Sequence, residues 1–247
     1  MDVRDSETEA YFDAHTPEYD AGRFALVAER IRALAGEGSS LLEVGCGTGN
    51  VLAYLREVTG VRRLAGLDVS ARCLERARER LGCETHLGSL LDDELVGRLA
   101  ERFDFAIVGA VLHHLIGATR RASRALARRG MANALSMVRP GGHLFVLEPV
   151  FYPSVTMDLV FYVKKLAMKV TSGRIEIFDR WNNLGAPVVS YYTNEQLRRM
   201  AEDDPRAEVV DLRATPARIT ALQRAAMIYR REDTTLELRR RRVTTPS

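Results

Sequence analysis

Short apolar runs alternate with longer stretches of helical periodicity along the first 150 residues. The apolar runs at 40–45, 62–68, 83–87, 104–111 and 143–149 indicate five buried strands. A helix-like stretch separates each of these strands from the next, and Ser70 is placed to cap the helix expected over 71–81. Such alternation predicts an α/β fold with a parallel sheet and right-handed crossovers. Ligands are then expected at the carboxyl ends of the strands.

The regular alternation stops at Pro149. In residues 150–192, apolar side chains at 159, 163, 166 and 170 form one helical stripe, which Phe161 and Met168 widen. We predict that this insert covers the acceptor side of a ligand site as a lid. A helix packed on the domain with its lysines in water is the competing interpretation, and contact with a membrane surface is a weaker one. Residues 207–212 and 224–230 resemble closing strands.

The length of 247 residues fits one domain, which we place at 1–235, with N-terminal cap helices over 1–35. Residues 236–247 are expected to be a flexible basic tail, because residues 230–242 hold six arginines among few apolar residues. The rest of the chain is near neutral, which disfavours a nucleic-acid partner. The arginines at 120, 124 and 128 share one helix face and are expected in solvent.

Three cysteines, at 46, 73 and 83, lack metal-ligand spacing, so we expect free thiols and no metal site. Free thiols favour a reducing, cytoplasmic location. The acidic N-terminus is not typical of a signal peptide, and no apolar run is long enough for membrane insertion.

The stretch "LLEVGCGTGN" at 41–50 places Gly45, Gly47 and Gly49 directly after a buried strand. Asn50 stands where the dinucleotide fingerprint has its third glycine. S-adenosylmethionine (SAM) has no pyrophosphate, but it has a cationic amino group that Glu43 can face. Asp68, at the end of the second strand, can accept hydrogen bonds from both ribose hydroxyls. The loop alone is also compatible with a glycine-rich turn that binds nothing.

Four motifs extend this argument. "LLEVGCGTGN", "LAGLDVS", "FDFAIVGAVLHHL" and "VRPGGHLFVLEP" resemble, in order and spacing, the successive motifs of class I SAM-dependent methyltransferases, in their small-molecule branch. The resemblance covers residues 10–150. It implies a Rossmann-like, doubly wound sheet of seven mostly parallel strands with an N-terminal cap helix. The implied cofactor is SAM, with S-adenosylhomocysteine as its product.

The resemblance also implies roles for single residues. Glu43 and the three glycines would form the SAM loop, Asp68 would bind the ribose and Val69 would lie along the adenine. Many members have an aspartate after the third strand, but here Gly88 and Ser89 occupy that place. The remaining residues expected to touch the cofactor are Ser89, Leu90, Ala110, and Tyr11 and Tyr19 in the cap helix.

Methyl transfer needs a general base only when the acceptor must lose a proton. We name His114 and Glu148, at the ligand ends of the fourth and fifth strands, as catalytic candidates. A structural role for each is the alternative. The residues expected to line the acceptor pocket are His113, Tyr152, Trp181, Tyr191 and Tyr192.

The predicted function is methyl transfer to a small-molecule acceptor, a specialised natural product with a hydrophobic part, by a monomer or homodimer. Two alternatives stay open: a SAM-binding fold that has lost or redirected methyl transfer, and a nicotinamide-dependent oxidoreductase. A nucleic-acid methyltransferase is disfavoured, because the segment after the fourth strand reads "GAVL" and not Asp/Asn-Pro-Pro-aromatic.

Overall fold

The computed structural model describes residues 21–171 and 188–242. The strands are β1 (Ser40–Val44), β2 (Arg63–Asp68), β3 (Glu84–Leu87), β4 (Phe103–Gly109), β5 (Val138–Tyr152), β6 (Ala207–Pro216) and β7 (Arg230–Arg240). The helices are η1 (Ala21–Phe24), α2 (Ala25–Leu34), α3 (Asn50–Thr59), α4 (Ala71–Leu81), α5 (Asp93–Leu99), η2 (Leu112–His114), α6 (Arg120–Met137), α7 (Ser154–Thr171), α8 (Asn194–Glu202) and α9 (Ala221–Ala225).

The seven strands form one sheet in the order β3-β2-β1-β4-β5-β7-β6. Strands β1 to β5 pair in parallel, and β7 runs antiparallel to both β5 and β6. The predicted Rossmann-like sheet of seven mostly parallel strands is therefore confirmed. The strand order reverses direction at β1 and β4, so the carboxyl ends of these two strands flank the switch point where ligands bind in such sheets.

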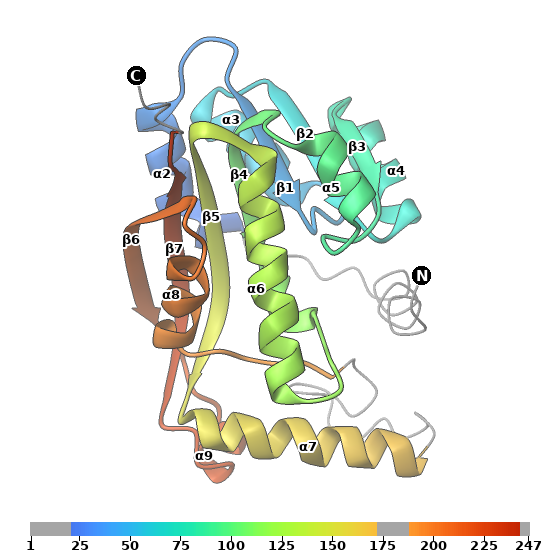
Figure 1. Ribbon diagram of the computed structural model, residues 1–247, viewed down its shortest axis with the longest axis vertical. Coiled ribbons are helices and arrows are strands. Elements are labelled where there is room, and N and C mark those ends of the chain that lie inside the picture. The colour runs from blue at the N-terminus through green and yellow to red at the C-terminus, as the bar shows by residue number, and fades with distance from the viewer. Residues whose placement is uncertain (1–20, 172–187, 243–247) are drawn as a thin grey trace.

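Helices cover both faces of the sheet because side chains alternate between the two sides of each strand (Figure 1). Leu42, Val108 and Val146 pack with α5, α6 and α8 on one face. On the other face, Ile107 and Phe145 pack with α2, α3 and α4. Strands with both faces buried are continuously apolar, which is why the sequence showed them as short apolar runs.

The end of the chain differs from the prediction. Residues 236–240 are not a flexible tail, because β7 continues to Arg240 between β5 and β6. Leu236 and Leu238 are fully buried on one face of this strand. The strand expected over 224–230 was also wrong: α9 ends at Ala225, and a turn leads into β7.

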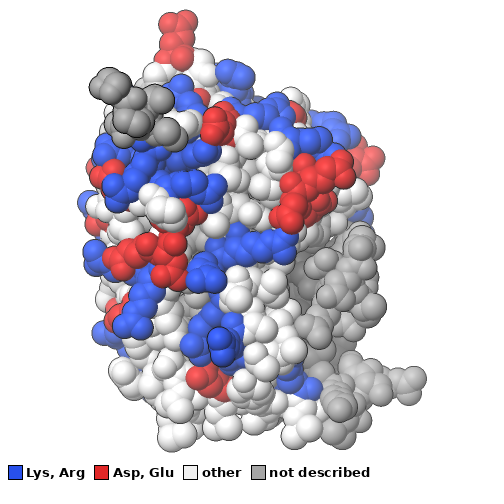
Figure 2. Space-filling view, in the orientation of Figure 1, with Lys and Arg blue, Asp and Glu red and all other residues white. Residues whose placement is uncertain are grey.

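Helix α7 lies across the carboxyl end of the sheet, nearly perpendicular to α6 (Figure 1). Its predicted apolar stripe faces away from the domain, with Leu159, Val163 and Leu166 each more than half exposed. The buried side instead holds Met157, Phe161 and, contrary to expectation, Lys164. Charged side chains are correspondingly sparse at the α7 end of the face in Figure 2. No helix in the described ranges is long and apolar enough to cross a membrane.

Candidate active site

The glycine loop is a tight turn between β1 and α3, held against the end of β2. The backbone N–H groups of Gly45 and Cys46 both donate to the carbonyl of Leu67, at 2.7 and 3.2 Å. Gly45, Gly47 and Gly49 have φ values of +73°, +50° and +76°, which residues with a side chain rarely adopt. The glycines are therefore required by the backbone of this turn.

The three glycines differ in what lies beside them. A Cβ on Gly45 would lie 2.5 Å from Val111, and a Cβ on Gly49 would lie 2.9 Å from Leu81. A Cβ on Gly47 would meet no atom of the described residues within 4 Å. Gly45 and Gly49 thus allow close packing within the protein, whereas Gly47 borders open space in which a ligand can lie.

Asp68 links the ends of β1 and β2. One carboxylate oxygen accepts the N–H of Gly47 at 2.8 Å, and the other accepts the N–H of Ser70 at 2.9 Å. The carbonyl of Asp68 accepts the N–H of Gly88 at 3.0 Å, which brings the turn after β3 to the same edge. A carboxylate oxygen has two lone pairs, and ribose hydroxyls are donors that such a carboxylate can accept.

Glu43 is a buried acid with an unsatisfied oxygen. Its side chain is 3% exposed, and its Oε2 has no hydrogen-bond partner among the described residues. Burial raises the pKa of Glu43 well above its ordinary value, and the nearby charge of Asp68 raises it further. A buried polar atom without a partner is costly. A cationic amino group beside this carboxylate would remove that cost, so the residues present fit the methionine end of SAM.

The other expected cofactor contacts divide into three groups. Val69 and Ser89 are half-buried beside Asp68 and the turn after β3, and their contact with the cofactor stays a prediction. Ala110 has a φ of +57° and donates its N–H to Leu147, so the chain turns sharply after β4. Leu90 was expected to touch the cofactor, but its side chain is buried in the core and faces α5 and α6. Tyr11 and Tyr19 lie outside the described residues, as does Trp181, which was expected to line the acceptor pocket.

The two catalytic candidates are not arranged as expected. Glu148 is 1% exposed, and its two oxygens accept the N–H of Leu112 at 2.7 Å and contact His113 Nδ1 at 2.6 Å. The glutamate therefore faces His113 and not an open pocket. Burial lowers the pKa of His114 well below its ordinary value, with the charges of His113 and Lys164 adding to the effect. A histidine with a low pKa binds a proton weakly, which makes it a poorer base.

Of the described residues expected to line the acceptor pocket, Tyr191 and His113 are together. Their rings stack with centroids 5.2 Å apart. Tyr192 does not line a pocket as predicted. It is 1% exposed and its hydroxyl donates to the carbonyl of Ser123, so it belongs to the core. Tyr152 is a second correction, because its hydroxyl bonds the backbone of α8 and its ring lies 3.7 Å from the guanidinium carbon of Arg230.

Arg120 is a site residue that the sequence interpretation missed. It was expected in solvent, but it is 3% exposed at the start of α6. Its guanidinium donates to Asp158 on α7 at 2.7 Å, to the hydroxyl of Ser190, and to the carbonyl of Tyr191 at 2.6 Å. The one available signal was its place, directly after the "HHLIGAT" loop at the ligand end of the sheet.

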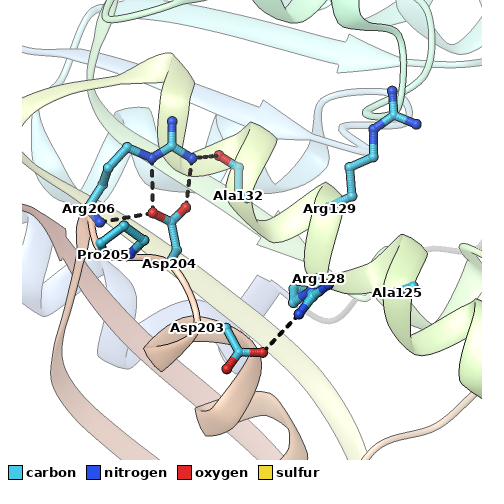
Figure 3. Close-up of a pocket in the computed structure, with 8 residues that line it drawn as sticks. All are labelled: Ala125, Arg128, Arg129, Ala132, Asp203, Asp204, Pro205 and Arg206. Carbon is cyan, nitrogen blue, oxygen red and sulfur yellow. Dashed lines mark hydrogen bonds and ion pairs between the residues drawn. The ribbon is translucent and has the colours of Figure 1, made fainter.

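A surface depression elsewhere is not part of this site. It lies between α6 and the loop after α8, and arginines line it (Figure 3). Arg128 pairs with Asp203 and Arg206 pairs with Asp204, as the dashed lines in Figure 3 show. Arg129, the third arginine of the depression, pairs with Asp93. The depression therefore has little unpaired charge to offer an anion.

Comparisons with known proteins agree with this geometry. The model of a methyltransferase-domain family matches residues 19–204. The chain is 31% identical over 109 residues to nodulation protein S of Rhizobium tropici, covering 44% of this chain and 42% of that protein. It is 32% identical over 133 residues to the dTDP-3-amino-3,4,6-trideoxy-alpha-D-glucopyranose N,N-dimethyltransferase of Streptomyces venezuelae, covering 53% and 51%. A ribosomal RNA small subunit methyltransferase C, from Klebsiella pneumoniae, is 27% identical over 140 residues, covering 56% and 39%.

These matches span about half the length of the relatives or less. Among solved structures, the N-methyltransferase NodS from Bradyrhizobium japonicum WM9, in complex with S-adenosyl-L-homocysteine, has a TM-score of 0.55 at 18% identity. The likeness covers 90% of this chain and 89% of that one, and at this identity it shows the fold. Because the family model matches most of the chain, the protein belongs to the methyltransferase-domain family, with the class I SAM-dependent fold.

Proposed function

We propose that the protein transfers the methyl group of SAM to a small-molecule acceptor. The observation that carries the proposal is the unsatisfied oxygen of Glu43, buried beside Asp68 and the open side of Gly47. These groups lie on a narrow turn without a pyrophosphate site. They suit a ligand that has a cationic amino group and a ribose. When bound, SAM supplies an electrophilic methyl group on sulfur. The described residues bind and orient it at the carboxyl ends of β1, β2 and β4.

A small acceptor is favoured by the relatives whose printed names concern nodulation and an amino sugar. The neighbouring structure titled for echinomycin biosynthesis fits a natural-product acceptor in the same way. His113 and Tyr191 stand on the acceptor side, where stacked rings offer apolar surface and one polar edge. The acceptor pocket is therefore suited to a compound with a ring or other apolar part beside its reactive atom.

Calorimetry with purified protein tests the cofactor. We expect SAM and S-adenosylhomocysteine to bind and NAD not to bind. Asp68→Ala should weaken SAM binding by about 10- to 150-fold, because charged hydrogen bonds are worth about 1.5–3 kcal/mol. Asp203→Ala, at an exposed ion pair far from the loop, is the matched control and should bind SAM as the wild type does. Binding of NAD without SAM would refute the proposal.

Incubation with SAM carrying a labelled methyl group tests the acceptor. Pools of amino sugars, hydroxylated aromatics, polyketides and ribosomal RNA are compared by mass spectrometry. Label in a small molecule supports the proposal. Label in RNA alone would replace it with the activity in the printed name of the ribosomal RNA relatives.

A further inference from the structure

Strand β5 contributes to two buried histidine–glutamate pairs, one at each end of the sheet. At the carboxyl end, Glu148 on β5 contacts His113 Nδ1 at 2.6 Å. At the opposite end, His143 on β5 contacts Glu237 on β7 through Nδ1 at 2.8 Å. The two pairs have the same chemistry and similar burial. They differ in what surrounds them, and that difference indicates what each one does.

The pair at the amino end of β5 includes a third charged group, which neutralises the carboxylate. Glu237 also accepts two hydrogen bonds from Arg30, at 2.8 and 2.9 Å. This pair joins α2, β5 and β7, far from the glycine loop. It therefore has a structural explanation.

In the pair at the carboxyl end, the second ring nitrogen of His113, Nε2, does not contact Glu148. A carboxylate only accepts hydrogen bonds, so the contact with Glu148 assigns the proton to His113 Nδ1. The Nε2 atom then carries a lone pair. Within the described ranges Nε2 forms no hydrogen bond. It is also not one of the polar side-chain atoms that are fully buried without a partner. A histidine with Nδ1 bonded to a carboxylate and Nε2 available is the arrangement of a general base.

The His113 ring is held in a fixed orientation. The ring centroids of Tyr191 and His114 lie 5.2 and 4.2 Å from that of His113. The backbone carbonyl of His113 accepts the N–H of Ser190 at 2.8 Å. Arg120 in turn binds both Ser190 and Tyr191. The groups facing His113 that can titrate are therefore Glu148, His114 and Tyr191, with Lys164 of α7 next beyond His114.

Burial lowers the pKa of Lys164 to about 8. Lys164 can therefore lose its charge above neutral pH. A change in activity above neutral pH must accordingly be assigned by substitution and not by pH alone.

We infer that His113 is the general base of the methyl transfer and that Glu148 is its positioning residue. The inference rests on the proposed function. In the step, a nitrogen or oxygen of the acceptor forms a bond to the methyl carbon, and the carbon–sulfur bond breaks with its electron pair remaining on sulfur. The proton lost by the acceptor atom moves to His113 Nε2, and Glu148 stabilises the resulting imidazolium. The acceptor class is thus an amine or hydroxyl compound whose reacting atom carries a proton.

The experiment compares two variants with a matched control. His113→Asn keeps an N–H donor toward Glu148 but removes the basic Nε2, and Glu148→Gln removes the charge that orients the ring. His143→Asn removes the equivalent atoms from the second pair and calibrates the cost of losing a buried histidine. Release of S-adenosylhomocysteine is followed from acidic to neutral pH with a mixture of amino sugars and hydroxylated aromatics as acceptor probes.

We expect His113→Asn to lower turnover by about 100- to 10,000-fold while SAM affinity stays unchanged. The wild type should lose rate toward acidic pH, and this loss should disappear in the His113→Asn variant. Glu148→Gln should give a smaller decrease, and His143→Asn should keep turnover. Turnover by His113→Asn equal to that of His143→Asn would overturn the inference alone, whereas a wild type that binds no SAM and releases no product would overturn the proposed function.

Nitrogen NMR of protein with labelled histidine, bound to S-adenosylhomocysteine, gives a readout that needs no acceptor. Protonated Nδ1 and bare Nε2 at His113 support the inference. The opposite tautomer overturns it, whatever the folding state of the variants.

Discussion

Replacing Glu237 with glutamine tests whether a buried charge network holds the closing strand in place. Burial alone would raise the pKa of Glu237, but hydrogen bonds from His143 and Arg30 outweigh it and lower the pKa to about 2, from an ordinary 4.5. A carboxyl whose pKa is lower in the folded state stabilises the fold above its unfolded pKa. That stability is lost as the pH falls from about 4.5 toward 2.

The lowering corresponds to about 3 kcal/mol at neutral pH. The Arg30 side chain is 40% exposed, so water and salt screen part of its contribution. We therefore expect Glu237→Gln to lower the free energy of unfolding by about 2–3 kcal/mol at pH 7. At pH 3 the folded protein has lost more than half of this term, and the two proteins should differ by about 1 kcal/mol.

Urea unfolding followed by circular dichroism, at several pH values from 7 to 3, measures the difference. Glu208→Gln is the matched control, because Glu208 is also a glutamate that pairs with an arginine, Arg239, but both side chains are more than a third exposed. This control should cost less than about 1 kcal/mol. A difference for Glu237→Gln that is the same at pH 7 and pH 3 would refute the reasoning, because it would come from packing and not from ionisation.

Four further substitutions have defined outcomes. Leu238→Ala, at a fully buried position of β7, should lower the free energy of unfolding by about 2–5 kcal/mol in urea unfolding. No loss of stability would instead support the flexible tail that the sequence predicted. Gly49→Ala should cost about 1–3 kcal/mol of stability, because its φ is +76° and its Cβ would come within 2.9 Å of α4. Gly47→Ala, with no neighbour near its Cβ, should mainly weaken SAM binding in calorimetry, and the reverse pattern would contradict the assignment of open space. Arg120→Met should cost about 3–5 kcal/mol, and the control Arg128→Met, whose side chain is 56% exposed, less than about 1 kcal/mol.

Most of the sheet could be predicted because its strands leave a local trace in the sequence. Buried parallel strands are short apolar runs, and each helix between them has its own start signal, such as Ser70 before α4. Strand β7 leaves no such trace. Its charged side chains are neutralised by residues far away in the chain, as Glu237 is by Arg30, so the local composition is that of a solvated tail.

The cofactor side of the site was predictable for the same reason. Glu43, Asp68 and the glycines lie next to strand ends, and position along the strand determines where they point. The acceptor side depends on contacts between distant segments. The pairing of His113 with Glu148 and the burial of Arg120 against Asp158 both join residues at least 35 positions apart. The orientation of α7 likewise depends on which face meets the domain, and its apolar pattern alone pointed the wrong way.

The isolated parallel bridge between Val150 and Tyr192 has a consequence for how the acceptor side can change. Val150 lies two residues before the end of β5, and the chain comes back beside it at Tyr192, so the two ends of the segment between them are adjacent. Lengthening or replacing a loop with fixed, adjacent ends changes the closure entropy only slowly with length. Exchange of the segment between these two residues is therefore expected to leave the strands of the sheet unchanged. In a chimeric protein, Val150 and Tyr192 are therefore the positions at which the segment from another protein would be joined to this chain.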